Sequence, residues 1–365
     1  MPELLAWYDR GHRTLPWRSD PTPYHVWLSE IMLQQTRVEA VKPYYARFLE
    51  ALPDIEALAM CPEEKLLKLW EGLGYYNRVR NLQKAAQVIC AQYGGQMPER
   101  YEELIKLPGI GSYTAGAITS IGFGHAYPAV DGNVLRILAR LRADERDIAK
   151  EKVRRSVEAE LLPQMPADRP GDFNQAMMEL GAVVCLPGGD PLCGECPWEK
   201  DCLAHAAARE KDYPVKAAPK ARTCEDMTVL VLQDDARIAL RRRPGSGLLA
   251  GLYELPHLSG HRSAEEVQEY LDAQGLKVLR ILPLPAAKHI FSHREWHMVG
   301  YSIRVDELEK GKPGEDAAGW IYVAPEETRE QYPIPSAFAA YAGAIGMRAA
   351  AEELQARKLG GKRSE

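Results

Sequence analysis

Two carboxyl groups in this sequence, those of Glu30 and Asp131, stand in contexts that suit them for complementary roles in acid-assisted bond cleavage. Glu30 lies in an apolar run between Trp27 and Leu33, where loss of water raises the pKa of an acid because burial disfavours the charged form. Asp131 precedes the amphipathic residues 134–140, so we expect it at a helix N-terminus, where backbone N–H groups and the helix dipole lower the pKa of a carboxyl. One neutral acid and one carboxylate are what glycoside cleavage requires.

Each carboxyl also has a purely structural interpretation. Glu30 fits equally well a carboxylate that is paired with an arginine or capped by backbone amides. The sequence Asp131-Gly132-Asn133 is the usual form of a helix cap with no catalytic role. From the residues alone, both interpretations stay open.

A glycine-containing turn lies between the two carboxyls, at Pro108-Gly109-Ile110-Gly111, with helical patterns on both sides, over residues 101–107 and 112–121. We expect the amides of Gly109 and Gly111 to point outward at the open N-terminus of the second helix, where an anion is favoured. Because the donors belong to the backbone, such a turn would hold a phosphate strand without reading its sequence. An ordinary interhelical turn is the alternative.

Four of the seven cysteines crowd into residues 185–202 with the spacing C-x7-C-x2-C-x5-C, at Cys185, Cys193, Cys196 and Cys202. The odd total argues against a disulfide framework. A zinc site usually shows two short knuckles of paired ligands, whereas only one C-x-x-C is present here, so the spacing favours a four-iron, four-sulfur cluster. We expect this [4Fe-4S] cluster to be structural, because it is far in sequence from both carboxyls.

Together, the hairpin, Asp131 and the cysteine cluster resemble the helix-hairpin-helix DNA glycosylases of the endonuclease III type, over residues 1–205. The resemblance implies that Glu30 is the general acid, that Asp131 stabilises a cationic sugar, and that Tyr113 and Asn133 orient water and the carboxylates. Members of this superfamily that also cut the strand carry a lysine at the position of Tyr113. A phenol cannot form the imine that leads to strand cleavage, so we expect a monofunctional glycosylase.

Among the monofunctional members, the chain most resembles the adenine DNA glycosylases, which act on adenine opposite 8-oxoguanine or guanine in duplex DNA. The resemblance assigns Arg18 and Gln175 to the target base, Gln35 and Thr36 to the opposite base, Leu73 and Tyr75 to a wedge that enters the base stack, Gly109 and Gly111 to phosphate, and Ser292 and His293 to the damaged base. An ordinary surface or core role is the alternative for each of these residues.

The C-terminal part of the chain reads as strands, at residues 228–232, 238–240 and 320–323. Residues 241–256 resemble the beginning of a Nudix domain, but residues 268–276 lack the arginine and the glutamate pair of the Nudix metal motif. We therefore expect this domain to carry out no hydrolysis, and the resemblance to the adenine DNA glycosylases implies that it recognises 8-oxoguanine.

Three histidines, His289, His293 and His297, recur every four residues. On a helix this spacing would suggest a metal site. The alternating apolar residues that follow, from Val299 to Val305, are typical of a strand, so we expect no metal site built from these three histidines.

The expected fold class is multidomain: an all-α helix-hairpin-helix glycosylase domain with an iron–sulfur loop, followed by an α+β Nudix-like domain. We place these parts at residues 1–205, with the loop at 185–202, an interdomain linker at 206–226, the Nudix-like domain at 227–350 and a tail at 351–365.

The formal net charge of −5 is unusual for a DNA-binding chain, because phosphate affinity rests on Lys and Arg. Only the contact face must be basic, however. Candidates for that face are Arg78, Arg80, Lys106, Arg136 and Arg140.

The sequence has no apolar run of membrane-spanning length and no basic N-terminal flank with a cleavage site. A cytoplasmic monomer that binds double-stranded DNA and no membrane is therefore expected. Two other functions stay open: a thymine or uracil mismatch DNA glycosylase, and a noncatalytic iron–sulfur protein that only binds DNA.

Overall fold

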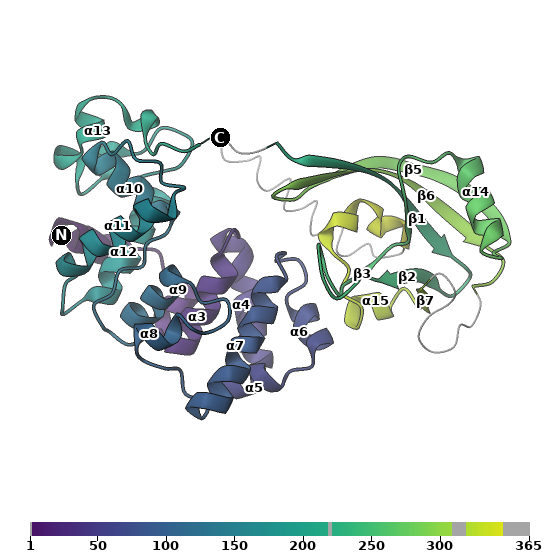
Figure 1. Ribbon diagram of the computed structural model, residues 1–365, viewed down its shortest axis with the longest axis horizontal. Helices are drawn as coiled ribbons and strands as arrows, with labels where there is room; N and C mark the ends of the chain where they lie inside the picture. Colours follow the sequence, from purple (N-terminus) through teal and green to yellow (C-terminus); the bar gives the residue numbers. More distant parts are fainter. Residues whose placement is uncertain (1, 218–220, 309–318, 346–365) are drawn as a thin grey trace. The chain divides into compact units, whose positions relative to one another are not determined.

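The computed structural model describes residues 2–217, 221–308 and 319–345, and its contacts divide the chain into two compact units. The first unit comprises Met1–Cys61 and Asn77–Pro219, and the second comprises Pro62–Tyr76 and Lys220–Glu365. Figure 1 shows helices in the first unit and a curved sheet in the second. The tail expected at residues 351–365 lies outside the described residues.

The first unit is built from helices. In chain order they are α1 (Pro2–Gly11), α2 (Pro16–Ser19), α3 (Pro23–Leu33), α4 (Val38–Ala51), α5 (Ile55–Met60), α7 (Asn77–Tyr93), α8 (Tyr101–Leu104), α9 (Ser112–Ala117), the π-helical η1 (Ile118–Gly122), α10 (Gly132–Arg142), α11 (Glu151–Leu161), η2 (Leu162–Gln164), α12 (Pro170–Val183), η3 (Cys193–Glu195), η4 (Glu199–Asp201), α13 (Leu203–Ala206) and η5 (Glu210–Asp212). Among its described residues this unit has no strand, as expected for an all-α domain.

Side-chain caps fix where several of these helices begin. Thr22 accepts a hydrogen bond from the backbone of His25 at the start of α3, and Asp54 accepts one from Ala57 at the start of α5. Asp131 caps α10 in the same way. Each cap satisfies an N–H group that has no partner within its own helix.

Two groups of helices meet in the first unit. Helix α3 packs against α4, α7, α9 and η1, whereas α12 packs against α1, α10 and η1. The second group encloses an apolar core to which α1, α10, α11 and α12 contribute Leu4, Leu138, Val157 and Leu180. Helix α3 is buried along almost its whole length, including Glu30, so its polar side chains face protein and not bulk water.

The second unit is a mixed sheet. Its elements are α6 (Glu63–Leu69), β1 (Thr223–Gln233), β2 (Ile238–Arg242), β3 (Tyr253–Glu254), β4 (His257–Ser259), α14 (Ala264–Ala273), β5 (Val278–Ile290), β6 (Arg294–Val305), β7 (Trp320–Val323), α15 (Glu327–Glu330) and the 3-10 helical η6 (Ser336–Ile345). In the described residues the strand order is β3-β2-β1-β6-β5, with β4 also paired to β1 and β7 to β2. Strands β1 and β6 run parallel, and the other pairs are antiparallel.

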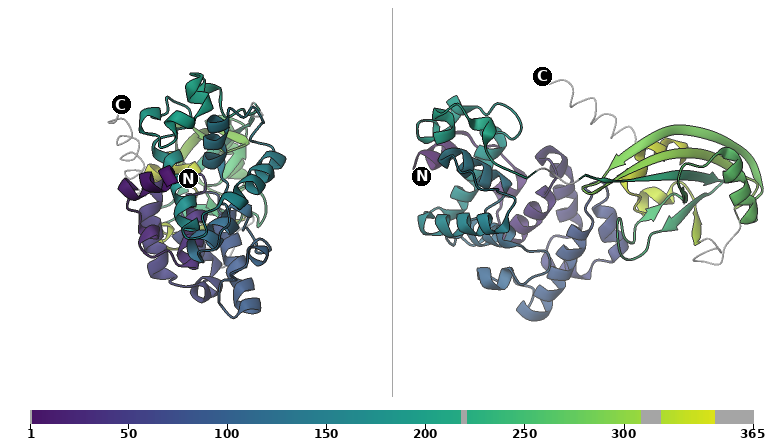
Figure 2. Two further views of the ribbon diagram at one scale, coloured as in Figure 1. Left: turned by 90° about the vertical axis from the view of Figure 1, so that its left-hand side faces the viewer. Right: turned by 45° about the horizontal axis from the view of Figure 1, so that its top comes forward.

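The two faces of this sheet bury separate cores, because side chains alternate along a strand. Met227 and Val229 of β1 pack with Phe338 of η6 on one face. Leu230 and Leu232 of β1 lie in a second core, to which α14 contributes. In Figure 2 the green strands β5 and β6 curve over the yellow η6 segment.

Hydrogen bonds tie residues 62–76 to the rest of the second unit. Lys68 Nζ donates to Thr328 O (2.9 Å), and Ile334 N donates to a carboxylate oxygen of Glu71 (2.7 Å). The sequence did not indicate this association, since residues 62–76 are separated from the C-terminal residues by most of the first unit.

The sequence from residue 336 to about residue 358 is typical of one helix, and the described part differs from this. Residues 336–345 form the 3-10 helical η6, and the remainder lies outside the described residues. Phe338 and Tyr341 are three residues apart and both are buried, a spacing that the three-residue period of a 3-10 helix places on one face. None of the described helices is long and apolar enough to cross a membrane.

Candidate active site

A cavity of about 860 Å³ in the first unit brings together side chains from α3, α9, α12 and the start of α10. Nine of the residues that the sequence singled out line it: Arg18, Glu30, Gln35, Thr36, Gly111, Tyr113, Asp131, Asn133 and Gln175. Trp17, the neighbour of Arg18, lines it as well. Residues that are up to 157 positions apart in the chain, from Arg18 to Gln175, thus line the same cavity.

Glu30 is the most strongly perturbed acid of this cavity. Glu30 is only 6% exposed, and burial raises the pKa of its carboxyl to about 7. The hydroxyl of Tyr113 donates a hydrogen bond to Glu30 Oε2, which lowers the pKa, while the nearby charge of Asp131 raises it. A pKa near 7 agrees with the expectation from the sequence, and it lets the carboxyl hold a proton at neutral pH.

Asp131 lies at the N-cap of α10, as predicted. Its Oδ1 accepts hydrogen bonds from the backbone of Asn133 (2.9 Å) and Val134 (2.8 Å), and its Oδ2 accepts one from Asn133 Nδ2 (2.7 Å). The predicted direction of its pKa was wrong, however. Burial raises the pKa of Asp131 by more than these three hydrogen bonds lower it, because the cap lines the cavity, where the carboxyl has lost part of its contact with water.

Tyr113 is hydrogen-bonded to Glu30 and lies near the charge of Asp131. Burial and the carboxyls of Glu30 and Asp131 raise the pKa of the phenol well above its ordinary value. The phenol therefore stays protonated and acts as a hydrogen-bond donor. Its hydroxyl also lies 3.7 Å from the sulfur of Met178 on α12.

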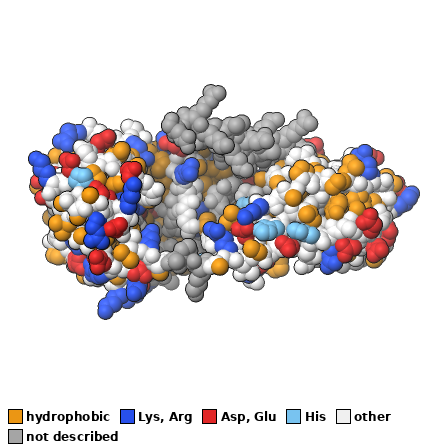
Figure 3. All heavy atoms as spheres, turned by 90° about the horizontal axis from the view of Figure 1, so that it is seen from above, with side chains coloured by type: hydrophobic (Ala, Val, Ile, Leu, Met, Phe, Trp, Pro, Cys, Tyr) orange, Lys and Arg blue, Asp and Glu red, His pale blue; other side chains and the backbone are white. Residues whose placement is uncertain are grey.

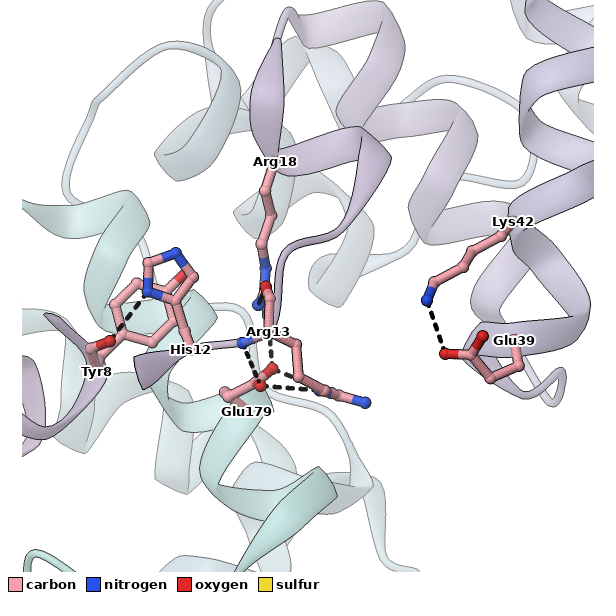
Figure 4. Close-up of polar contacts among 7 residues, drawn as sticks. All are labelled: Tyr8, His12, Arg13, Arg18, Glu39, Lys42 and Glu179. Atoms are coloured by element: carbon pink, nitrogen blue, oxygen red, sulfur yellow. Dashed lines mark hydrogen bonds and ion pairs between the residues drawn. The ribbon is translucent and has the colours of Figure 1, made fainter. Parts of the chain in front are cut away.

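Sequence reasoning missed the buried Glu179, which holds two arginines at the cavity wall (Figure 4). Its carboxylate accepts hydrogen bonds from Arg13 N (3.0 Å), Nε (2.8 Å) and Nη2 (3.0 Å), and from Arg18 Nη2 (2.8 Å). Although burial alone would raise its pKa, these bonds hold the pKa of Glu179 at about 2. A glutamate within the apolar segment of α12 is the one signal that the sequence offered.

The turn that follows α3 carries Gln35 and Thr36 into the same cavity. Gln35 adopts a positive φ of 57°, a left-handed conformation that costs energy for a non-glycine residue. Arg78 stabilises this turn by donating from Nη1 to the carbonyl oxygens of Ile31 (2.7 Å) and Gln34 (2.6 Å). Strained backbone that is held in this way is common at binding sites.

The glycine turn before α9 has a clear steric reason for its sequence. Gly109 has a φ of +75°, and a Cβ added there would lie 2.6 Å from Asn81 Cβ, so another residue would meet both strain and a clash. Gly111 is the N-cap of α9 and has open space around it. Both glycines are exposed.

The four cysteines of residues 185–202 line one mostly apolar cavity, with Ile137 and Trp198 among its other walls. All four are free thiols, and burial raises the pKa of Cys193 and Cys196 to about 11. Among the described residues no three of these sulfur atoms lie within 4.8 Å of one another.

Arg136 and Arg140, which were candidates for a basic DNA-contact face, are 6% and 4% exposed, so they lie on no exposed face. Arg136 Nη2 donates to Asn133 Oδ1 (2.9 Å), and its Nε donates to Cys185 O (2.9 Å). Arg140 Nη1 lies 3.2 Å from Cys185 Sγ. Both arginines project from α10 and hold the start of the cysteine loop, because buried guanidinium groups need acceptors.

The remaining predicted DNA contacts belong to the second unit. Leu73 is buried, whereas Tyr75 is 48% exposed and has a φ of 49°. Ser292 and His293 are exposed in the turn between β5 and β6. Tyr75 and Ser292 hydrogen-bond to each other through their hydroxyl groups (2.8 Å), so two predicted contact residues that are 217 positions apart lie together.

Known proteins resemble the chain in both units. The family model described as HhH-GPD superfamily base excision DNA repair protein matches residues 28–163, and the NUDIX domain model matches residues 227–343. An adenine DNA glycosylase of Mus musculus is 36% identical in sequence, and the match covers 83% of this chain and 70% of the mouse protein. An adenine DNA glycosylase of Buchnera aphidicola is 33% identical, and the match covers 84% of this chain and 87% of the Buchnera protein. The structure of a thermostable thymine-DNA glycosylase is 26% identical, with a TM-score of 0.52, and covers 56% of this chain and 94% of that one. The two family models agree with the predicted fold class.

Proposed function

Because this chain belongs to the adenine DNA glycosylase family, and is therefore a DNA glycosylase of base excision repair, we propose that it hydrolyses the N-glycosidic bond of adenine paired with 8-oxoguanine or guanine in duplex DNA. One observation carries the proposal. Glu30 and Asp131 line the same cavity, and the acid with a pKa of about 7 is hydrogen-bonded to Tyr113.

Glu30 is the general acid in this proposal. Adenine is a poor leaving group as an anion, and protonation of a ring nitrogen lets it depart as a neutral base. Glu30 holds the required proton at neutral pH because it is buried, and Tyr113 fixes its orientation. The ion-paired Arg18 and the half-buried Gln175 hold the base within the cavity.

Asp131 stabilises the sugar as positive charge develops on it. Its three hydrogen-bond donors keep the carboxylate in one orientation, and electrostatic stabilisation by a preoriented group is a large contribution to catalysis. The cavity lining contains no lysine, so an imine with the sugar is not part of the reaction. The product is an intact strand with an abasic sugar.

Cys185, Cys193, Cys196 and Cys202 hold a [4Fe-4S] cluster in this proposal. The four free thiols around one cavity and their sequence spacing, with a single C-x-x-C, support that assignment. The cluster supplies a rigid anchor for the loop when it is bound. Arg136 and Arg140 attach that loop to α10, whose first turn carries Asp131 and Asn133.

The extruded base and its partner contact different residues of the chain. Gln35 and Thr36 probe the base opposite adenine, and Gly109 and Gly111 bind phosphate. Tyr75 is the wedge, with Leu73 behind it, because Tyr75 is exposed and Leu73 is buried. Ser292 and His293 contact 8-oxoguanine.

The test is base release from defined duplexes. Full-length, iron-loaded protein is incubated with adenine opposite 8-oxoguanine, guanine or cytosine, and with thymine or uracil opposite guanine. Alkali-labile sites are expected for adenine opposite 8-oxoguanine and guanine alone, and no strand breaks before alkali treatment. Release of thymine or uracil instead would assign the chain to the mismatch glycosylases.

Three variants test the mechanism. Glu30→Gln and Asp131→Asn should each lower single-turnover base release by about 10²-fold or more and still bind the duplex. Glu50→Gln, which changes an exposed carboxyl on α4, should match the parent protein. Base release at the parent rate by both cavity variants would remove the proposed roles.

A further inference from the structure

One face of the sheet in the second unit carries a cluster of metal-ligating side chains that the proposed function does not use. In the parallel pair of β1 and β6, Cys224 is opposite Glu295 and Asp226 is opposite His297. Alternation along β6 places Trp296 on the other face, where it is buried and donates from Nε1 to Glu225 (2.9 Å). Figure 3 shows histidines beside acidic and basic side chains on one face of this unit.

The side-chain atoms are close enough to share one ion. Cys224 Sγ, a carboxylate oxygen of Glu295 and a ring nitrogen of His297 all lie within 4.8 Å of one another. Ligand atoms around a tetrahedral zinc are about 3.3–3.8 Å apart, given bonds of about 2.0–2.3 Å. Small rotations about the χ angles therefore bring the three atoms to bonding distance, and water can complete the coordination on the exposed side.

The ring of His297 lies between two carboxylates. Its Nε2 donates a hydrogen bond to Glu295 Oε1 (2.7 Å), and its Nδ1 lies 3.7 Å from Asp226 Oδ1. A ligating histidine commonly gives its second ring N–H to a carboxylate, which fixes the tautomer and the ring plane. An ion bound to Nε2 would replace the hydrogen bond to Glu295, and the ring proton would then lie on Nδ1, on the side of Asp226.

The local charges also suit a divalent cation. A Cys224 thiolate with the carboxylates of Asp226 and Glu295 carries three negative charges. Lys288, which is ion-paired with Glu295, and a divalent ion together neutralise them. Glu295 has a side chain only 12% exposed, so its charge is shielded from water and must be balanced by neighbouring groups. His261 is near, with Nε2 3.8 Å from Asp226 Oδ1.

We propose that Cys224, Glu295 and His297 form a binding site for one divalent transition-metal ion, with Asp226 orienting His297. Zn²⁺ is the best match, because a thiolate, an imidazole and a carboxylate are its usual ligands. The ion joins β1 to β6 next to the turn that carries Ser292 and His293. Metal binding at this site does not depend on the proposed glycosylase activity.

The test is a titration of the full-length, iron-loaded protein with ZnSO₄ in chelator-free buffer, followed by calorimetry. One Zn²⁺ per chain is expected, with the visible absorption of the iron cluster unchanged. Cys224→Ser and His297→Asn should each weaken binding at least tenfold, and Asp226→Asn should weaken it about tenfold, as the loss of an orienting carboxylate does. Titration with Co²⁺ should give thiolate-to-cobalt charge-transfer absorption, which Cys224→Ser abolishes.

Two control variants separate this site from other thiols. Cys90→Ser removes a half-buried cysteine of α7, and His205→Asn changes the group of Cys193, His205 and Glu210, which also lies within 4.8 Å. Both should keep the Zn²⁺ site of the parent protein. Zinc binding that is lost in His205→Asn and kept in Cys224→Ser, or an absence of binding by the parent protein, would overturn the proposal.

Discussion

Protonation of Glu30 should govern the pH dependence of base release above neutrality. With a pKa of about 7, the protonated fraction of this carboxyl falls from about 0.9 at pH 6 to about 0.1 at pH 8. If only the protonated form donates to adenine, kcat/KM should fall about tenfold over this range, since this parameter reports the pKa values of the free enzyme. Because the pKa of Glu30 is raised above its ordinary value, the carboxyl is still protonated near neutral pH, and it loses this catalytic proton as the pH rises further.

Replacing Tyr113 by Phe sharpens the test. The phenol donates to the Glu30 carboxylate and lowers its pKa, so its removal should raise that pKa. A hydrogen bond to a charged group contributes about 1.5 kcal/mol, which corresponds to about one pKa unit. The descending limb of the profile should therefore move from about pH 7 to about pH 8 in Tyr113→Phe, although the maximal rate also falls.

The assay is base release from an 8-oxoguanine–adenine duplex at subsaturating concentration, in buffers of constant ionic strength from pH 5 to 9. Duplex binding by Glu30→Gln, measured at the same pH values, corrects for changes in affinity. Glu50→Gln should reproduce the parent profile. A rate that is constant between pH 6 and 8, or a limb at the same pH in Tyr113→Phe and the parent protein, would refute the assignment of Glu30 as the acid.

Three further predictions follow from the site. Glu179→Gln should lower the free energy of unfolding by about 3 kcal/mol in denaturant titrations at pH 7. The difference in this free energy between the variant and the parent should shrink as the pH falls from about 4.5 toward 2. The reason is that the pKa of Glu179 is lowered in the folded protein, so its stabilising contribution is present at neutral pH and is lost when the carboxyl is protonated. Gly109→Ala should weaken duplex binding in salt titrations more than Gly124→Ala does, since both glycines have positive φ but only Gly109 has a neighbour in contact with an added Cβ; equal losses would mean that backbone strain alone matters. The Arg140→Leu variant should contain less iron per chain than the parent protein after purification and dialysis, because Arg140 holds Cys185 and Leu186. An iron content equal to that of the parent would show that the cysteine loop does not need this arginine.

The sequence predicted the helices around the site because their signals are local. The apolar run and the cap each depend on a few neighbouring residues, and α3 contains that run while α10 begins directly after Asp131. The apolar neighbours of Glu30 indicated burial and a raised pKa, but a paired carboxylate stayed open from the residues alone, and the resemblance to the glycosylases favoured the acid.

Properties that depend on distant contacts were not predicted. The pKa of Asp131 rises because its carboxyl is buried where the cap lines the cavity, and no local pattern indicates that burial. Glu179 is paired with Arg13 and Arg18 over more than 160 positions. Arg136 and Arg140 resembled surface charges because their burial depends on how the cysteine loop folds over α10.

The second unit is assembled from two separate stretches of polypeptide, and this has a consequence for truncation. A fragment ending at residue 219 would keep every residue of the catalytic cavity, yet residues 62–76 would lose the hydrogen bonds of Lys68 to Thr328, Glu71 to Ile334 and Tyr75 to Ser292. The C-terminal part is therefore no detachable module. Shortening the gene at the linker would disturb an internal loop of the N-terminal half as well.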